Sequence, residues 1–127
     1  MQNDNLKVKT GKSDLKQRAY LVALRVIKLI DLLPKEVTAQ TIGKQLIRSA
    51  TSIAANIAEA RGSSSKKDFT NFFSYSLKSA NESIFWVELL RDSGKAKGID
   101  LTSILQELNE VANILGSSLL TLRGKRK

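Results

Sequence analysis

The sequence predicts an all-α protein, an antiparallel up-down-up-down four-helix bundle. Apolar residues recur three and four apart in four segments of about 20 to 28 residues, which is the helical period. The segments between them are short and rich in Pro, Gly and Ser, so consecutive helices should lie side by side and antiparallel. Apolar and polar residues do not alternate over more than a few positions, so no strand is expected. A chain of 127 residues suffices for one such domain.

The first helix is expected to follow a flexible basic N-terminal segment, residues 1–12. Ser13 is a suitable N-cap, and Pro34 should end the helix. Its apolar stripe consists of Leu15, Ala19, Val22, Val26, Leu29 and Leu33. The run YLVALRVIKLI is apolar almost all round, which suggests a second buried face. The second helix should run from about Thr38 to Arg61, where a Gly-Ser-Ser-Ser run breaks it, with a stripe made of Ile42, Leu46, Ile53 and Ile57.

The third helix should begin after Ser65, which precedes Asp68 by three residues as in a capping box, and reach about Ser93. Its core face consists of Phe69, Phe73, Ala80, Ile84 and Val87. Its other side carries Tyr75, Glu82, Phe85, Trp86 and Leu89. A helix with two apolar sides is usually buried on both. Trp86 and Tyr75 therefore either pack on a neighbouring helix of the same chain or form a subunit interface.

The fourth helix should follow a glycine-containing turn in which Gly94 is a natural C′ residue of the third helix. Asp100 is expected to cap it, and its stripe consists of Ile104, Leu108, Val111, Leu115, Leu119 and Leu122. The bundle is thus expected to span residues 13–123, and residues 124–127 form a basic C-terminal tail.

The composition favours a binding protein over an enzyme. Lys and Arg number 21 against 12 Asp and Glu, a net charge of +9, which points to polyanions and above all to nucleic acid. A solvated basic surface is the alternative. Histidine and cysteine are both absent, which removes the commonest general base, thiol nucleophiles and Cys/His zinc sites. We therefore expect no catalytic residue, no cofactor and no metal.

Phosphate contacts are expected from basic residues that gather at the termini and in the connections. These are Lys7, Lys9, Lys12, Lys16, Arg18, Lys66, Lys67, Lys95, Lys97, Arg123, Lys125, Arg126 and Lys127. Such binding should tolerate sequence changes and depend steeply on salt. The competing hypothesis is a protein-interaction scaffold whose charge serves mainly solubility. The sequence shows neither a signal peptide nor an apolar stretch of ~18 residues, so a cytoplasmic protein is expected, with no membrane partner.

A stripe of small polar residues flanks the apolar face of the second helix. Ser52, Asn56 and Glu59 recur three and four apart, with Arg48 on the same flank. Asn56 is expected to form a hydrogen bond across a close helix contact, and Glu59 to pair with a basic residue such as Arg48 of a neighbouring chain. A lone glutamate without histidine or a second carboxylate is poor catalytic chemistry. We interpret the following residues as an assembly or packing set: Arg48, Ser52, Asn56, Glu59, Tyr75, Glu82 and Trp86.

The stretch LIRSATSIAANIAEARGSSSKKDFTNFFSYSLKSANES resembles the signature region of a bacterial four-helix-bundle family, the ribosomal or large-subunit rRNA intervening-sequence proteins. The positions that match are Gln45, Leu46, Arg48, Ser52, Ile53, Asn56, Ile57, Ala58, Glu59, Lys67, Phe69, Phe72 and Phe73. Glu82 and Glu88 are both candidates for the family's glutamate in the third helix. Ala60 replaces a usual glycine, and Ala55 replaces a common proline.

This resemblance implies a left-handed up-and-down bundle that assembles as a homopentameric ring with a central channel. It also implies a distant relation to accessory proteins of diversity-generating retroelements, which are basic pentamers that bind nucleic acid and associate with a reverse transcriptase. The function expected for this chain is therefore non-enzymatic, oligomeric binding of nucleic acid, RNA more than DNA. The alternative is a scaffold or accessory subunit for a reverse transcriptase or a ribosome-related partner.

Overall fold

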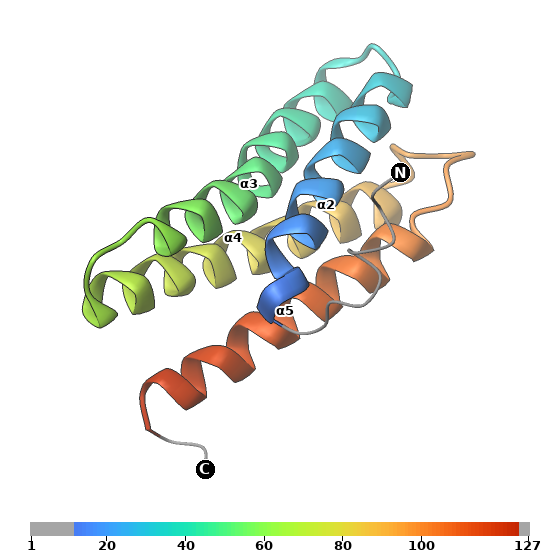
Figure 1. Ribbon diagram of the computed structural model, residues 1–127. Helices are drawn as coiled ribbons and strands as arrows, with labels where there is room; N and C mark the ends of the chain where they lie inside the picture. The colour runs from blue at the N-terminus through green and yellow to red at the C-terminus, as the bar shows by residue number, and fades with distance from the viewer. Residues whose placement is uncertain (1–11, 125–127) are drawn as a thin grey trace, which may run out of the picture.

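In a computed structural model, the chain is described over residues 12–124, and its side chains from Leu15 onwards. Four helices and no strand occupy this part of the chain: α2 (Lys12–Leu32), α3 (Val37–Arg61), α4 (Lys66–Asp92) and α5 (Thr102–Leu122). Consecutive helices run in opposite directions (Figure 1). The principal contacts join α2 to α3, α3 to α4, α4 to α5, and α5 back to α2. The expected all-α arrangement of four helices is confirmed.

The core lies where the four predicted stripes meet. Every residue predicted to form the core face of the first helix, α2, is buried, and so is every residue predicted to form the core face of α3. On α4, Phe73, Ala80 and Val87 are buried, whereas Phe69 and Ile84 are half-buried and pack against the core from its edge. The α5 stripe is buried up to Leu119. Periodicity alone therefore located the core, because burial of one stripe per helix is what stabilises a bundle.

The helix starts agree with the predictions in part. α2 begins at Lys12, so Ser13 lies in its first turn and is not the N-cap as predicted. α3 begins at Val37 behind Glu36, whose side chain makes no capping hydrogen bond. The predicted cap of α4 is confirmed, because the Ser65 hydroxyl accepts a hydrogen bond of 3.1 Å from the Asp68 backbone N–H.

The connection between α4 and α5 is built by a left-handed glycine and an aspartate. Gly94 has a φ of +75°, and its N–H donates to the Arg91 carbonyl while the next N–H donates to the Leu90 carbonyl. These two bonds form a Schellman motif, as the sequence predicted for a C′ glycine. The Asp100 carboxylate accepts the Thr102 N–H at 3.0 Å, which lowers the pKa of Asp100 and satisfies one free N–H at the start of α5. The N-cap of α5 is Leu101, so Asp100 acts from one residue before the position predicted for it.

Candidate nucleic-acid interface

Three basic segments face one end of the bundle. The connection between α3 and α4 and the end of α5 lie at that end, whereas α2 starts further inward, over the middle of α5 in the view of Figure 1. We use the name basic end for the five exposed cationic side chains that these segments supply: Lys16, Arg61, Lys66, Lys67 and Arg123. Glu59 and Asp68 are the acidic residues closest to them along α3 and α4. The basic end therefore carries an excess of positive charge on exposed side chains.

The opposite end of the bundle is nearly balanced. Its two connections and the last turn of α4 supply four basic residues, Lys35, Arg91, Lys95 and Lys97, and three acidic ones, Glu36, Asp92 and Asp100. Lys95 Nζ lies 2.8 Å from a Glu36 carboxylate oxygen, and Arg91 Nε lies 2.7 Å from Asp92 Oδ1. The Arg91 guanidinium lowers the pKa of Asp92. Of the predicted phosphate ligands, Lys95 and Lys97 thus lie away from the basic end, and Lys95 is already paired.

Arg18 belongs to an ion-pair network inside the chain. Its Nε and Nη2 lie 2.8 Å and 3.0 Å from the two Glu107 carboxylate oxygens, and Nη2 also donates to Glu110. Only 25% of the Arg18 side chain is exposed. The hydrogen bond that Arg18 donates to Glu107 is the main reason that the pKa of Arg18 rises above its usual value. Arg18 therefore joins α2 to α5, and we leave it out of the candidate interface.

The other predicted phosphate ligands lie outside what the structure describes. Lys7, Lys9, Lys125, Arg126 and Lys127 are outside residues 12–124, and Lys12 has no described side chain.

The polar stripe on α3 faces α4, where Ser52 is the point of contact. Ser79 donates a hydrogen bond of 2.9 Å from its hydroxyl to the Ser52 hydroxyl. Asn56 donates from Nδ2 to the Ser52 hydroxyl and to the Ser52 carbonyl, both at 2.9 Å. Within the chain, Asn56 thus donates to an acceptor one turn earlier on its own helix. A hydrogen bond from Asn56 across a helix contact stays a prediction. The bond across the contact comes from serines.

More serines continue this contact along α3 and α4. The hydroxyls of Ser49 and Ser83 lie 2.8 Å apart, and Ser76 donates to the Ile53 carbonyl at 2.9 Å. We call the five residues that join the two helices the serine seam: Ser49, Ser52, Ser76, Ser79 and Ser83. Its α4 half, made of Ser76, Ser79 and Ser83, was not among the residues predicted from the sequence, although the three have helical spacing. Small side chains let the helices approach closely, and throughout residues 15–124 no buried polar side-chain atom lacks a partner.

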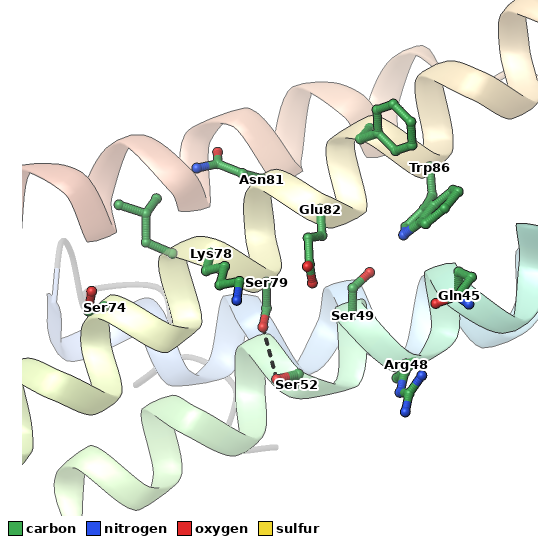
Figure 2. A pocket seen from close by; sticks show the side chains of 12 residues that line it. Gln45, Arg48, Ser49, Ser52, Ser74, Lys78, Ser79, Asn81, Glu82 and Trp86 are labelled. Atoms are coloured by element: carbon green, nitrogen blue, oxygen red, sulfur yellow. Dashed lines mark hydrogen bonds between the residues drawn. The ribbon is translucent and has the colours of Figure 1, made fainter.

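A groove of about 830 Å³ runs beside the serine seam between α3 and α4. Figure 2 shows Glu82 reaching from α4 towards α3, and the Trp86 ring projecting towards Gln45. Arg48 on α3 and Lys78 on α4 also line the groove. Among the described side chains, neither Arg48 nor Glu59 forms an ion pair. Their predicted pairing between neighbouring chains stays a prediction.

Trp86 is half-buried and packs against the core of its own chain. The ring of Phe85 meets it edge-on, with 4.8 Å between centroids. Phe85 and Tyr75 are each 54% exposed, so the outer side of α4 is only partly covered. The assembly role predicted for Tyr75 and Trp86 stays a prediction.

A second apolar surface lies on the outside of α2. We call its four residues the α2 stripe: Tyr20, Leu21, Leu24 and Ile27, each between 39% and 57% exposed. The sequence indicated a second buried face on this helix, and in the single chain that face is exposed.

Two kinds of feature are not found in the described residues. Within residues 12–124, no helix combines the length and the apolar character that a membrane crossing needs. No three acidic side chains gather as metal ligands in the same part of the chain, which contains no histidine or cysteine.

The fold and the basic end define a basic four-helix up-and-down bundle. The family described as 23S rRNA-intervening sequence protein matches residues 11–117, so the chain belongs to that family. The chain is also similar to a crystal structure of a protein of unknown function from the S23 ribosomal protein family of Bacteroides thetaiotaomicron VPI-5482. The two chains are 34% identical with a TM-score of 0.74, and the match covers 83% of this chain and 97% of the other. No curated protein matches the chain.

Proposed function

We propose that this chain is a non-enzymatic, oligomeric protein of the cytoplasm that binds nucleic acid, RNA in preference to DNA, through phosphate contacts at the basic end. The observation that carries the proposal is the contrast between the two ends of the bundle. Five exposed cations at the basic end stand against two nearby carboxylates of α3 and α4, whereas four cations at the other end stand against three carboxylates. A polyanion is attracted to such a concentration of charge.

Phosphate contacts at the basic end would hold the nucleic acid in position without distinguishing its base sequence. Lys66 and Lys67 lie in the first turn of α4, where the positive end of the helix dipole adds to their charge. Lys16 and Arg123 come from different helices, so a phosphate backbone that follows the basic end meets several segments. Lysine and arginine contacts to phosphate carry no direct base information. The proposal therefore predicts binding that tolerates sequence changes.

Assembly belongs to the same proposal. The α2 stripe offers an apolar surface that one chain leaves exposed, and burying it against a second copy is favourable. A ring would repeat the basic end around its axis and so strengthen the field that a nucleic acid meets. We propose the homopentamer that the family resemblance implies, with a central channel.

A pair of charge reversals tests the basic end. Lys66→Glu with Lys67→Glu, and Lys35→Glu with Lys97→Glu at the opposite end, each lower the net charge from +9 to +5, two units per substitution. Binding of a fluorescent RNA hairpin is measured by anisotropy at about 50 and 200 mM salt. We expect the first variant to bind at least about tenfold more weakly with a shallower salt dependence, and the control to keep most of the affinity. Equal losses of RNA affinity in the two variants would mean that binding depends only on the net charge and not on the basic end, which contradicts the proposal.

A protein-interaction scaffold is the second candidate. The observation in its favour is the exposed apolar surface of α2, which continues at its end with Leu32, 67% exposed, and beyond it with Val37, 83% exposed. Such a surface suits a protein partner as well as a second copy. An oligomer that binds neither RNA nor DNA at low salt would favour the scaffold.

A further inference from the structure

We propose that the groove between α3 and α4 binds an unpaired nucleotide of RNA, with its base stacked on Phe85 and Trp86 and its phosphates near Arg48 and Lys78. The inference rests on the proposed RNA binding, but it concerns a different surface from the basic end. It adds a preference for single strands, which phosphate contacts alone do not provide.

The aromatic side of the groove is already in place for stacking. Core packing holds the half-buried Trp86, and the Phe85 ring lies against it at an interplanar angle of 72°. Phe85 remains 54% exposed. A ring held by its own chain loses little freedom when a base stacks on it, and aromatic platforms of this kind are how single strands are bound.

The polar groups of the groove suit the edge of a base. The seam serines on its floor already bond to one another or to backbone, so they are largely satisfied. The other polar side chains of the lining include Gln45 on α3 and Glu82 on α4, and neither of these two makes a side-chain hydrogen bond within the described residues. An amide both donates and accepts, whereas a carboxylate accepts from ring and exocyclic N–H groups. A volume of about 830 Å³ is within the usual range for ligand pockets.

Charge favours a nucleotide over a second copy of the chain. Arg48 and Lys78 stand on opposite helices with Glu82 between them, so the groove is positive overall and its cations can meet phosphates. The buried centre of an interface between copies is usually depleted of charged residues, which describes the α2 stripe better than this groove. A paired base has its faces covered by its neighbours, so only unpaired nucleotides can use the aromatic wall.

The chain provides its own probe, because Trp86 is its only tryptophan. An unstructured single-stranded RNA octamer and an RNA duplex of equal length are titrated while Trp86 fluorescence and RNA anisotropy are both recorded. We expect saturable quenching by the single strand, because stacking on the indole changes its emission. The duplex should bind through the basic end with little quenching.

Two matched comparisons identify the groove as the source of the signal. Phe85→Ala removes an exposed ring and should weaken single-strand binding about 5- to 100-fold while changing duplex binding less than about twofold. Arg48→Ala should reduce single-strand affinity more than Lys44→Ala, since both remove one exposed cation from α3 but only Arg48 lines the groove. Reversal of Lys66 and Lys67 should weaken both RNAs alike and leave the quenching at saturation intact.

Three results would overturn the inference, and they separate it from the proposed function. Single-strand binding without quenching of Trp86 fluorescence would exclude the groove as the binding site but would leave the proposal that the chain binds RNA intact. A change of solution mass in Phe85→Ala, or in Trp86→Leu, which keeps an apolar side chain against the core, would show that copies of the chain cover this groove. Absence of binding by either RNA at low salt would refute the proposed function itself, and this inference with it.

Discussion

Replacing Ser83 with residues of two sizes tests whether the serine seam is a packing device. Ser83 is fully buried, and its hydroxyl lies 2.8 Å from that of Ser49 and 2.9 Å from the Ser79 carbonyl, to which it donates. In Ser83→Ala the Ser49 hydroxyl keeps the Leu46 carbonyl at 3.2 Å as an acceptor, so no buried donor is orphaned. The loss should therefore be about 0.5–1.5 kcal/mol of unfolding free energy.

Ser83→Leu should cost more, because the added volume has no space where α3 and α4 are in contact. Overpacking adds about 1–3 kcal/mol to the loss of the hydrogen bond, so the unfolding free energy should fall by roughly 1.5–4.5 kcal/mol in total. Urea unfolding followed by circular dichroism measures both variants, with Asn71→Leu on the exposed side of α4 as the size control. Protein concentration is held constant because assembly changes apparent stability. If Ser83→Ala lowers the free energy of unfolding as much as Ser83→Leu does, the reasoning is refuted, because the polarity of the serine seam and not the small size of its side chains would then determine stability.

Three further predictions concern the ends and the outer faces of the bundle. Arg18→Lys keeps the positive charge but loses the two-point hydrogen bonding to Glu107, so urea unfolding should show that the free energy of unfolding falls by about 1 kcal/mol. RNA affinity should stay within about twofold, and a larger fall in affinity would mean that Arg18 belongs to the RNA interface. Leu24→Glu on the α2 stripe should lower the solution mass towards the 14.0 kDa of one chain, whereas Leu120→Glu, at equal exposure on α5, should not. The lowered pKa of Asp100 means that its carboxylate stabilises the fold above the ordinary value of 3.8, and that this contribution disappears as the pH falls through the folded-state pKa. The melting temperature of Asp100→Ala should thus lie below that of the unchanged chain at about pH 7 and approach it at about pH 3, and an unchanged gap would contradict the capping role.

The fold could be predicted from the sequence because each helix repeats its apolar residues at the helical period over many turns. Local signals also sufficed where a single residue decides the geometry, as at Gly94 and at the Ser65 cap. Ser13 shows the limit of such signals, because a suitable capping residue does not prevent the helix from beginning one residue earlier.

The side-chain contacts within the candidate interfaces could not be predicted from the sequence. Lys16 and Arg18 are both cations near the start of α2, yet only Arg18 faces Glu107, and the register between α2 and α5 decides that. Asn56 has an acceptor one turn away on its own helix, and local hydrogen bonds of this kind compete with those across a contact. Composition predicts the sign of a charged surface, whereas tertiary packing determines which of its side chains remain available.

Both proposals about RNA assume that binding and assembly are compatible. Lys66, Lys67 and Arg123 lie at the end of the bundle, and the α2 stripe lies along its side, so copies that meet through the stripe leave these three cations open to solvent. Loss of assembly in Leu24→Glu should therefore weaken RNA binding by removing the added field of neighbouring copies, without removing any phosphate contact within one chain.

The most direct test of the central claim is solution mass by light scattering, measured for the chain alone and with a short structured RNA at low and at high salt. The account predicts a mass near five times 14.0 kDa for the chain alone, a heavier complex with RNA at low salt, and release of the RNA at high salt. A monomer, or an oligomer whose mass does not change with RNA at low salt, would contradict it.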